Sequence, residues 1–220
     1  LLPHPQYDLL ILVRFKSAEN ACAAVSAIFR AGYTPSAMEF MERDAIEWTM
    51  KFIDNSIVPM TDDVQAHLLI EVDGNDMDVM MKDMEGISEV VMNYDCGEIL
   101  FAEDAQQKAE LWKLRRRVGE AVKSHSIYKE EDTVVPRAEL PVLLHGVKEI
   151  GAKYGFKSVC YGHAGDGNLH VNIIKGDLSD EEWNGSLKLG IVEIFNLVKK
   201  LGGTISGEHG IGLVQKEYMH

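Results

Sequence analysis

The alternation of hydrophobic and polar positions divides the chain into two similar series of predicted elements. In the first series, short apolar runs at residues 7–14 and 66–74 predict strands. An alanine-rich stretch at residues 17–32 predicts a helix that begins after Ser17 and ends at Gly32, because serine caps helix starts and glycine follows helix ends. The series therefore begins with the order strand, helix, strand.

The remaining segments of the first series are assigned from their spacing of apolar residues. Residues 39–54 and 75–87 show helical spacing, and both are predicted to be helices. Residues 88–95 contain two adjacent valines and end in a turn-like segment, so they are predicted to form a strand.

The second series repeats this rhythm. Residues 104–124 predict a long helix, residues 131–136 an extended segment, and residues 137–155 a further helix. Strands are predicted at residues 157–165 and 168–174. A last helix follows a capping box, carries an apolar face and stops at two glycines; these features involve Ser179, Glu182, Trp183, Leu187, Ile191, Ile194, Val198, Gly202 and Gly203.

Helices that alternate with short strands predict an α+β fold in which helices cover a sheet. The two series suggest two similar halves, at about residues 1–100 and 101–220, within one domain that spans residues 1–220. No clear internal sequence repeat accompanies this division.

Composition narrows the class of protein. The net charge of −13 argues against a nucleic-acid partner, because phosphate contacts need clustered lysine and arginine. The three cysteines are far apart and show no zinc-ribbon spacing, which favours reduced thiols and a cytoplasmic location. The sequence contains no run of 18 apolar residues, so we predict no membrane-spanning helix in it.

The segment YGHAGDGNLHVNI, at residues 161–173, concentrates polar residues and glycines between two apolar runs. Asp166 and Gly167 predict a two-residue hairpin turn, since such turns need positive φ angles. That turn would pair His163 directly with His170, with Cβ atoms about 5 Å apart. One face of the hairpin would then be polar, and the other face would be apolar.

Two facing imidazoles can bind one divalent metal ion, but they need a third ligand. The segment SGEHGIG, at residues 206–212, offers Glu208 or His209 on a glycine-flanked turn. Two histidines and one carboxylate leave a coordination position open for catalysis. A solvent-exposed histidine pair without a metal remains the structural alternative.

The motifs GHAGDGNLHVN and GEHGIG together resemble the C-terminal, substrate-binding (cap) domain of FAD-linked oxidases. This family includes D-lactate dehydrogenases, the flavin subunit of glycolate oxidase and D-2-hydroxyglutarate dehydrogenases. The segments LWKLRRRVGEAV and EDTVVPRAEL also fit the family. The resemblance covers most of the chain, and it implies a duplicated ferredoxin-like α+β sandwich with a mostly antiparallel sheet.

The resemblance also implies a role for each motif residue. It implies three metal ligands: His163, His170 and Glu208. It implies that His209 is the catalytic base and lies beside the flavin. It implies three contacts to substrate: Arg115, Lys129 and Asn172.

Alternatives remain open for several of these residues. Arg115 lies in a basic cluster that could be a solvated helix face. Lys129 precedes two acidic residues and could simply pair with them. His209 could bind the metal in place of Glu208.

The expected activity is oxidation of a D-2-hydroxy acid to a 2-oxo acid by an FAD-dependent dehydrogenase. The resemblance implies FAD, bound mainly by an N-terminal domain that this chain lacks, and a divalent metal, with zinc or manganese expected. We therefore expect the chain alone to be inactive. A metal-dependent hydrolase that uses the same ligands and a non-catalytic ferredoxin-like binding module are the alternatives.

The expected partners are a small 2-hydroxy acid and an electron acceptor. The acceptor could be a quinone, a cytochrome, an electron-transfer flavoprotein or an iron–sulfur subunit. The sequence does not identify the hydroxy acid. It is compatible with a homodimer, and with a cytoplasmic protein that associates peripherally with a membrane.

Overall fold

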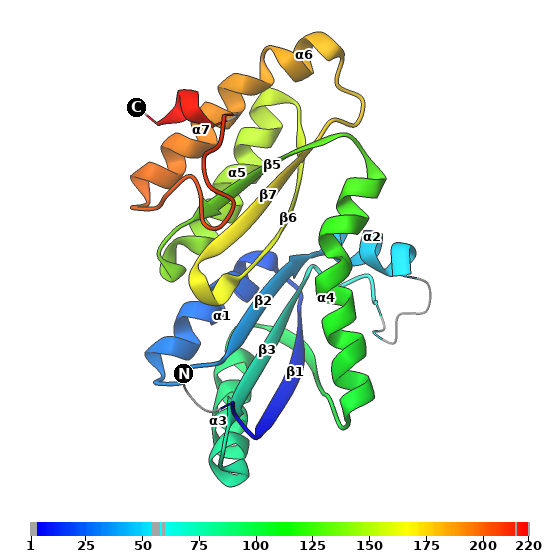
Figure 1. Ribbon diagram of the computed structural model, residues 1–220, viewed down its shortest axis with the longest axis vertical. Coiled ribbons are helices and arrows are strands. Elements are labelled where there is room, and N and C mark those ends of the chain that lie inside the picture. The colour runs from blue at the N-terminus through cyan, green and yellow to red at the C-terminus, as the bar shows by residue number, and fades with distance from the viewer. Residues whose placement is uncertain (1–3, 54–57, 59, 214, 220) are drawn as a thin grey trace.

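The computed structural model describes residues 4–53, 58, 60–213 and 215–219. Within these residues the strands form one sheet in the order β4-β1-β3-β2-β6-β7-β5, and all paired neighbours are antiparallel (Figure 1). The strands are β1 (Tyr7–Phe15), β2 (Ala37–Glu42), β3 (Ala66–Gly74), β4 (Cys96–Phe101), β5 (Tyr128–Val134), β6 (Lys157–Gly162) and β7 (Asn168–Ile174).

Helices connect most of these strands. The α-helices are α1 (Ala18–Arg30), α2 (Arg43–Ile53), α3 (Met77–Met92), α4 (Ala105–His125), α5 (Leu140–Tyr154), α6 (Asp180–Asn184) and α7 (Leu187–Lys200). Short 3-10 helices are η1 (Arg137–Glu139), η2 (Ala164–Asp166) and η3 (Lys216–Tyr218). None of the helices in the described part of the chain combines the length and the apolar character needed to span a bilayer.

The topology contains the same arrangement twice. The first unit runs β1-α1-β2-α2-β3-α3-β4, with α2 added between β2 and β3, and it has the ferredoxin-like strand order β4-β1-β3-β2. The α-helices and strands of the second unit run β5-α5-β6-β7-α6-α7, and its strand order β6-β7-β5 follows the same plan. Beside β5, where a fourth strand would lie, a single bridge joins Val134 to Thr204. The predicted duplicated ferredoxin-like α+β fold is confirmed.

The two units are joined edge to edge into one sheet. Strand β2 pairs with β6 through only two residue pairs, Phe40 with Gly162 and Met41 with Tyr161. Because successive side chains of a strand point to opposite faces, the joined sheet has two continuous faces.

Each face of the sheet packs against its own set of helices. Helices α1, α3, α5 and α7 cover one face and pack against strand residues such as Ile11, Leu68 and Val171. Helices α2 and α4 cover part of the other face and pack against residues such as Leu12 and Leu69. Over β6, β7 and β5 this second core includes Val159, Tyr161 and Ile174, and the polar residues His170 and Asn172 are buried beside it.

Most predicted elements lie where their patterns indicated. The hydroxyl of Ser17 accepts a hydrogen bond from the backbone N–H of Asn20 at 3.2 Å, and Gly32 has a φ of 96° after the end of α1. The capping box of Ser179 and Glu182 is present, but the helix that follows it is divided at Gly185 into α6 and α7.

Two assignments in the first unit were wrong. Residues 39–42, predicted to begin the helix at 39–54, belong to β2 instead, because this strand pairs with β3 and lies at the centre of the sheet. Residues 88–92 extend α3 rather than forming a strand, because Ile87 and Val91 pack the helix onto the core. Asp54, the last residue of the predicted helix at 39–54, lies outside the described residues.

The predicted two-residue hairpin turn was also wrong. A turn of 3-10 helix, η2, follows His163, and Gly167 closes it with a φ of 77°. His170 consequently pairs with Tyr161 rather than with His163. The register differs from the predicted one by two residues, so the predicted polar and apolar faces are still correct.

Candidate metal and substrate site

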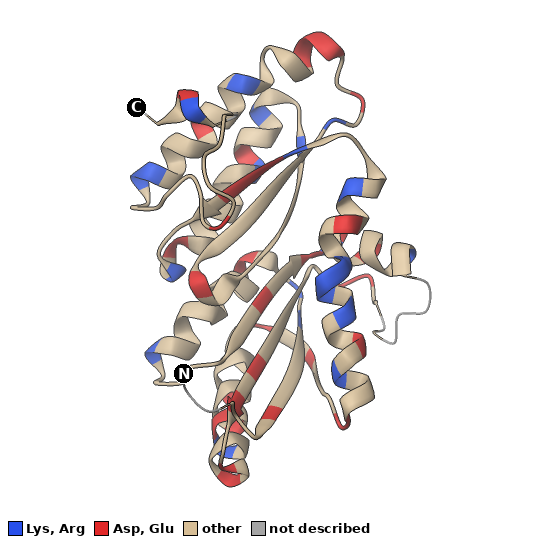
Figure 2. Ribbon diagram, in the orientation of Figure 1, with Lys and Arg blue, Asp and Glu red and all other residues tan. Residues whose placement is uncertain are grey.

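Polar side chains gather on the second face of the sheet, beside α4. Strand β7 contributes His170 and Asn172, and β2 contributes Glu39. His163 follows the end of β6, and Arg115 reaches the sheet from α4. Figure 2 shows lysine and arginine along α4, which lies beside strands that carry aspartate and glutamate.

His163, His170 and Glu208 converge here. One nitrogen from each imidazole and one carboxylate oxygen lie within 4.8 Å of one another. The Nε2 atom of His163 is 3.3 Å from Oε1 of Glu208, and the two histidine rings meet edge to face with centroids 5.9 Å apart. The structure therefore brings together the three predicted metal ligands.

A second donor set shares one of these histidines. Glu130, His170 and His209 also place one donor atom each within 4.8 Å of one another. The rings of His170 and His209 stack with centroids 5.3 Å apart. The predicted catalytic base thus lies directly beside a predicted metal ligand.

Glu39 links the metal-ligand set to the predicted substrate arginine. Its Oε2 accepts a hydrogen bond from Nε of Arg115 at 2.7 Å, and its Oε1 lies 2.9 Å from Nδ1 of His163. The Nη2 atom of Arg115 is buried and makes no hydrogen bond within the described residues. Glu39 therefore anchors Arg115 through Nε, while Nη2 is left without a hydrogen-bond partner.

The same contacts shift two pKa values. The hydrogen bond to Glu39 raises the pKa of His163, although burial opposes this shift. Burial alone would raise the pKa of Glu39, but the hydrogen bond from His163 and the charge of Arg115 lower it overall. Glu39 is thus ionised at neutral pH and directs Nδ1 of His163 toward itself, which leaves Nε2 free to face Glu208.

Strand β5 supplies carboxylates on the other side of His170. The Nδ1 atom of His170 lies 3.3 Å from Oε1 of Glu130 and 3.7 Å from Oδ1 of Asp132. Burial would raise the pKa of Glu130, but the contact with His170 and the nearby His209 lower it. Each of the two histidines predicted as metal ligands therefore has a carboxylate near one ring nitrogen, although Nδ1 of His170 makes no hydrogen bond within the described residues.

Asp132 contacts the turn that carries Glu208 and His209. Its Oδ2 accepts hydrogen bonds from the backbone N–H groups of Gly207, Glu208 and His209, at 2.9, 2.6 and 2.9 Å. Burial would raise the pKa of Asp132, but these N–H donors lower it to about 2. Asp132, Glu130 and Glu39 were not singled out in the sequence, although Asp132 lies in the EDTVVP segment.

The structure does not bring Lys129 to this site. Its register partner is Ile173, so its side chain points to the opposite face of the sheet from His170. The Nζ atom donates a hydrogen bond to the backbone oxygen of Trp183 at 3.0 Å and lies 4.8 Å from the centroid of the Trp183 ring. Burial lowers the pKa of Lys129 there.

Asn172 lies on the same face as His170 and is buried. Its Nδ2 donates a hydrogen bond to the backbone oxygen of Val159 at 3.3 Å, and its Oδ1 makes no hydrogen bond within the described residues. A cavity of about 260 Å³ adjoins the site between η2 and the start of β2, where Glu39 and His163 are among its lining residues.

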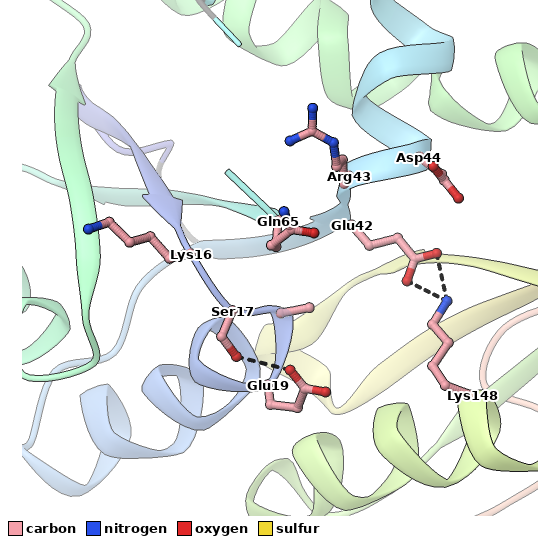
Figure 3. Close-up of a pocket in the computed structure, with 9 residues that line it drawn as sticks. Lys16, Ser17, Glu19, Glu42, Arg43, Asp44, Gln65 and Lys148 are labelled. Atoms are coloured by element: carbon pink, nitrogen blue, oxygen red, sulfur yellow. Dashed lines mark hydrogen bonds and ion pairs between the residues drawn. The ribbon is translucent and has the colours of Figure 1, made fainter. Parts of the chain in front are cut away.

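A larger pocket, of about 390 Å³, lies where α1 and α2 begin, and its lining residues do not include the donor sets above (Figure 3). Two of its charged groups pair with each other. Lys148 contacts both carboxylate oxygens of Glu42, at 2.8 and 2.7 Å, and Ser17 donates a hydrogen bond to Glu19 at 2.9 Å. The first contact ties α5 to β2, and the second stays within the start of α1, so we interpret this pocket as structural.

Residues 4–220 match the family described as FAD linked oxidases, C-terminal domain. The chain belongs to this family.

Curated relatives carry the names of hydroxy-acid enzymes. The chain is 29% identical to a D-lactate dehydrogenase of Anaerostipes hadrus over 100% of the chain and 47% of the relative. It is 30% identical to glycolate oxidase subunit GlcD of Bacillus subtilis over 100% of the chain and 46% of the relative. It is 33% identical to the Escherichia coli GlcD subunit, over 96% of the chain and 42% of the relative. The chain thus spans about half the length of these relatives.

Solved structures share the fold at low identity. A p-cresol methylhydroxylase superposes with a TM-score of 0.64 at 11% identity, over 93% of this chain and 46% of that one. An alkyldihydroxyacetonephosphate synthase superposes with a TM-score of 0.62 at 13% identity, over 92% of this chain and 41% of that one. These likenesses concern the fold alone.

Proposed function

We propose that this chain forms the substrate-binding side of an FAD-dependent dehydrogenase that oxidises a D-2-hydroxy acid to a 2-oxo acid. Family membership and relatives named for D-lactate and glycolate support this proposal. The observation that carries it is the convergence of two imidazoles and a carboxylate close to a buried arginine on one sheet face. Such a face can bind both functional groups of a 2-hydroxy acid.

A divalent metal fits the donor set of His163, His170 and Glu208. Their donor atoms lie within 4.8 Å of one another, and two neutral imidazoles with one carboxylate suit zinc or manganese. When bound, such an ion would polarise the substrate hydroxyl and lower its pKa. Glu39 and Glu130 would orient the two histidines through their second ring nitrogens.

Arg115 is proposed to bind the carboxylate of the substrate. A guanidinium matches a carboxylate in shape and can donate two parallel hydrogen bonds. Glu39 holds Nε of Arg115, which limits the rotation of the side chain, and the buried Nη2 lacks a hydrogen-bond partner within the described residues. Asn172 offers a buried Oδ1 on the same face, and we assign it a contact with the substrate.

His209 is proposed to accept the proton of the substrate hydroxyl. A neutral imidazole can take this proton near neutral pH, and His209 lies beside His170 at the open edge of the site. FAD would accept the hydride from the substrate carbon. We assign no substrate contact to Lys129, because its side chain lies on the other face of the sheet.

The whole enzyme needs parts beyond these residues. We propose that the chain acts as one domain, with halves at about residues 1–100 and 101–220, beside a domain that holds most of the FAD. The reduced flavin would pass its electrons to an acceptor protein or a quinone.

The direct test is reduction of the flavin in the full-length protein by 2-hydroxy acids without oxygen. We expect D-lactate, glycolate or D-2-hydroxyglutarate to bleach the oxidised flavin. His209→Gln should slow this reduction by about 10²–10⁴-fold, the usual contribution of a general base. His145→Gln, which changes an exposed histidine on α5, is the control. Absence of bleaching by any 2-hydroxy acid, together with metal-dependent ester hydrolysis, would favour the hydrolase instead.

A further inference from the structure

We propose that Asp132 is a positioning residue, whose carboxylate holds the turn of Glu208 and His209 in the geometry that the site requires. This inference rests on the proposed function, because that function gives Glu208 and His209 their roles. Asp132 itself lies behind the turn and is proposed to act only through it.

The hydrogen bonds converge on one oxygen atom. Three successive backbone N–H groups, of Gly207, Glu208 and His209, point at Oδ2 of Asp132. Successive N–H groups that point at one position form a concave binding site for an anion. In this chain the anion is an internal carboxylate, and it binds the residues that carry the predicted ligand and base.

Burial cannot position this turn. Glu208 and His209 are exposed, whereas Asp132 is 2% exposed. Besides these contacts, backbone hydrogen bonds join the segment to β5: Val134 and Thr204 exchange two, at 3.0 and 2.8 Å, and the N–H of Gly207 also donates to the backbone oxygen of Asp132 at 3.0 Å. Of the hydrogen bonds that hold Glu208 and His209 themselves, those to the Asp132 carboxylate involve a charged acceptor, and such bonds are about twice as strong as neutral ones.

Asp132 also links the turn to the strand that carries His170. Its Oδ1 accepts a hydrogen bond from Nδ2 of Asn168, the first residue of β7, at 2.6 Å. Gly207 packs closely against the Asn168 side chain, since a Cβ atom added to Gly207 would lie 2.6 Å from Nδ2 of Asn168. One carboxylate thus sets the position of Glu208 and His209 relative to His170.

The neighbouring residue provides a matched control. Glu131 is also a buried acid of β5, and its Oε2 accepts a hydrogen bond from Nε2 of Gln215 at 2.7 Å. Its side chain points to the opposite face of the sheet from Asp132. Glu131→Gln therefore makes the same chemical change one residue away from the site.

The test compares Asp132→Asn with Glu131→Gln in the full-length flavoprotein. In Asp132→Asn, we expect amide hydrogen exchange at residues 207–209 to become at least about 10-fold faster. Affinity for zinc, measured by competition with a chelator, should fall about 10–100-fold. The kcat for a 2-hydroxy acid should fall while KM changes little, because Arg115 is untouched. Glu131→Gln should leave all three quantities near their wild-type values.

A second variant displaces the turn without removing the acid. Gly207→Ala keeps Asp132 but introduces a Cβ clash with Asn168, so zinc affinity should fall here as well. Unchanged exchange at residues 207–209 in Asp132→Asn would overturn the inference, as would unchanged zinc affinity in both variants. Failure of the wild-type protein to bind zinc or oxidise a hydroxy acid would instead overturn the proposed function, while the exchange result would still decide whether Asp132 holds the turn.

Discussion

Three carboxylates organise the functional side chains of the site. Glu39 holds both His163 and Arg115, Glu130 lies against His170, and Asp132 binds the turn of His209. Each carboxylate is largely buried, and its pKa is lowered by the donors around it. The site therefore combines positive groups with fixed negative partners, which orient them before any ligand binds.

Arg115→Lys tests the proposed carboxylate contact at the level of one residue. Lysine keeps the charge but cannot hold Glu39 and a substrate carboxylate with one planar group. We expect KM for a 2-hydroxy acid to rise about 10–100-fold, the size of one or two lost charge-assisted hydrogen bonds.

Arg116→Lys is the matched control for this prediction. Arg116 is the next residue of α4, and its guanidinium lies over the ring of Trp112, 5.4 Å from the centroid. Its substitution should leave KM unchanged. Equal KM values for Arg115→Lys and wild-type protein would contradict the assignment of Arg115.

The sequence motifs identified the polar residues of the site better than they identified the carboxylates that hold those residues in place. His163, His170 and Glu208 stand in short glycine-rich segments, whose composition is unusual enough to be noticed. Asp132 and Glu39 lie within ordinary strand segments and acquire their contacts only through strand pairing. Lys129 was misplaced for a related reason: the side-chain period of a strand is two, so adjacent residues point to opposite faces.

At the scale of elements, tertiary packing determined whether a segment is helix or strand where the local sequence pattern was ambiguous. Strand β2 contains Glu39 and Glu42 among apolar residues, which imitates helical spacing, but it lies between β3 and β6 in the sheet. The valines at the end of α3 favour a strand locally, yet Val91 packs into the core as part of the helix. The strands predicted at 7–14 and 66–74 were clear because each contains a run of consecutive large apolar residues.

The turn between β6 and β7 offers a test of the element that carries His163. Gly167 has a φ of 77°, and an added Cβ would lie 2.0 Å from the backbone oxygen of Val135. Gly167→Ala should therefore lower the free energy of unfolding by about 2–4 kcal/mol, through backbone strain and displacement of η2.

Gly176→Ala is a control that introduces backbone strain without displacing a neighbouring element. Gly176 also has a positive φ, of 49°, but nothing lies within 4 Å of an added Cβ. We expect this variant to lose only about 1 kcal/mol in a denaturant titration. Similar losses in the two variants would show that η2 does not depend on the close approach at Gly167.

The pairing of Glu131 with Gln215 predicts a pH dependence of stability. Burial raises the pKa of Glu131 from 4.5 to about 7. The folded state thus favours the protonated acid, so the stability contributed by this residue falls as the pH rises from about 4.5 through 7. Glu131→Gln resembles the protonated form and should be more stable than wild type by about 1–3 kcal/mol at about pH 9.

This difference should shrink as the pH falls and vanish well below pH 4.5, where Glu131 is protonated in both states. Chemical denaturation of both proteins across this range measures it. A constant difference at every pH would mean that ionisation of Glu131 does not contribute.

At the scale of the whole molecule, the site depends on the junction of the two ferredoxin-like units. Glu39 belongs to the first unit, and the histidines and Asp132 belong to the second. Only two residue pairs join β2 to β6, yet Glu39 contacts His163 across that junction. The sequence suggested two halves, but their joining into one sheet depends on pairing between segments about 120 residues apart, which local patterns do not encode.

The most direct measurement is the metal content of the purified full-length protein and of His163→Ala and His170→Ala, by elemental analysis after incubation with zinc or manganese. His145→Ala, an exposed substitution on α5, is the control. The account predicts one tightly held divalent ion per chain at this site in the wild-type and control proteins, and loss of that ion in both site variants. Equal metal content in all four proteins, or none in the wild type, would contradict it.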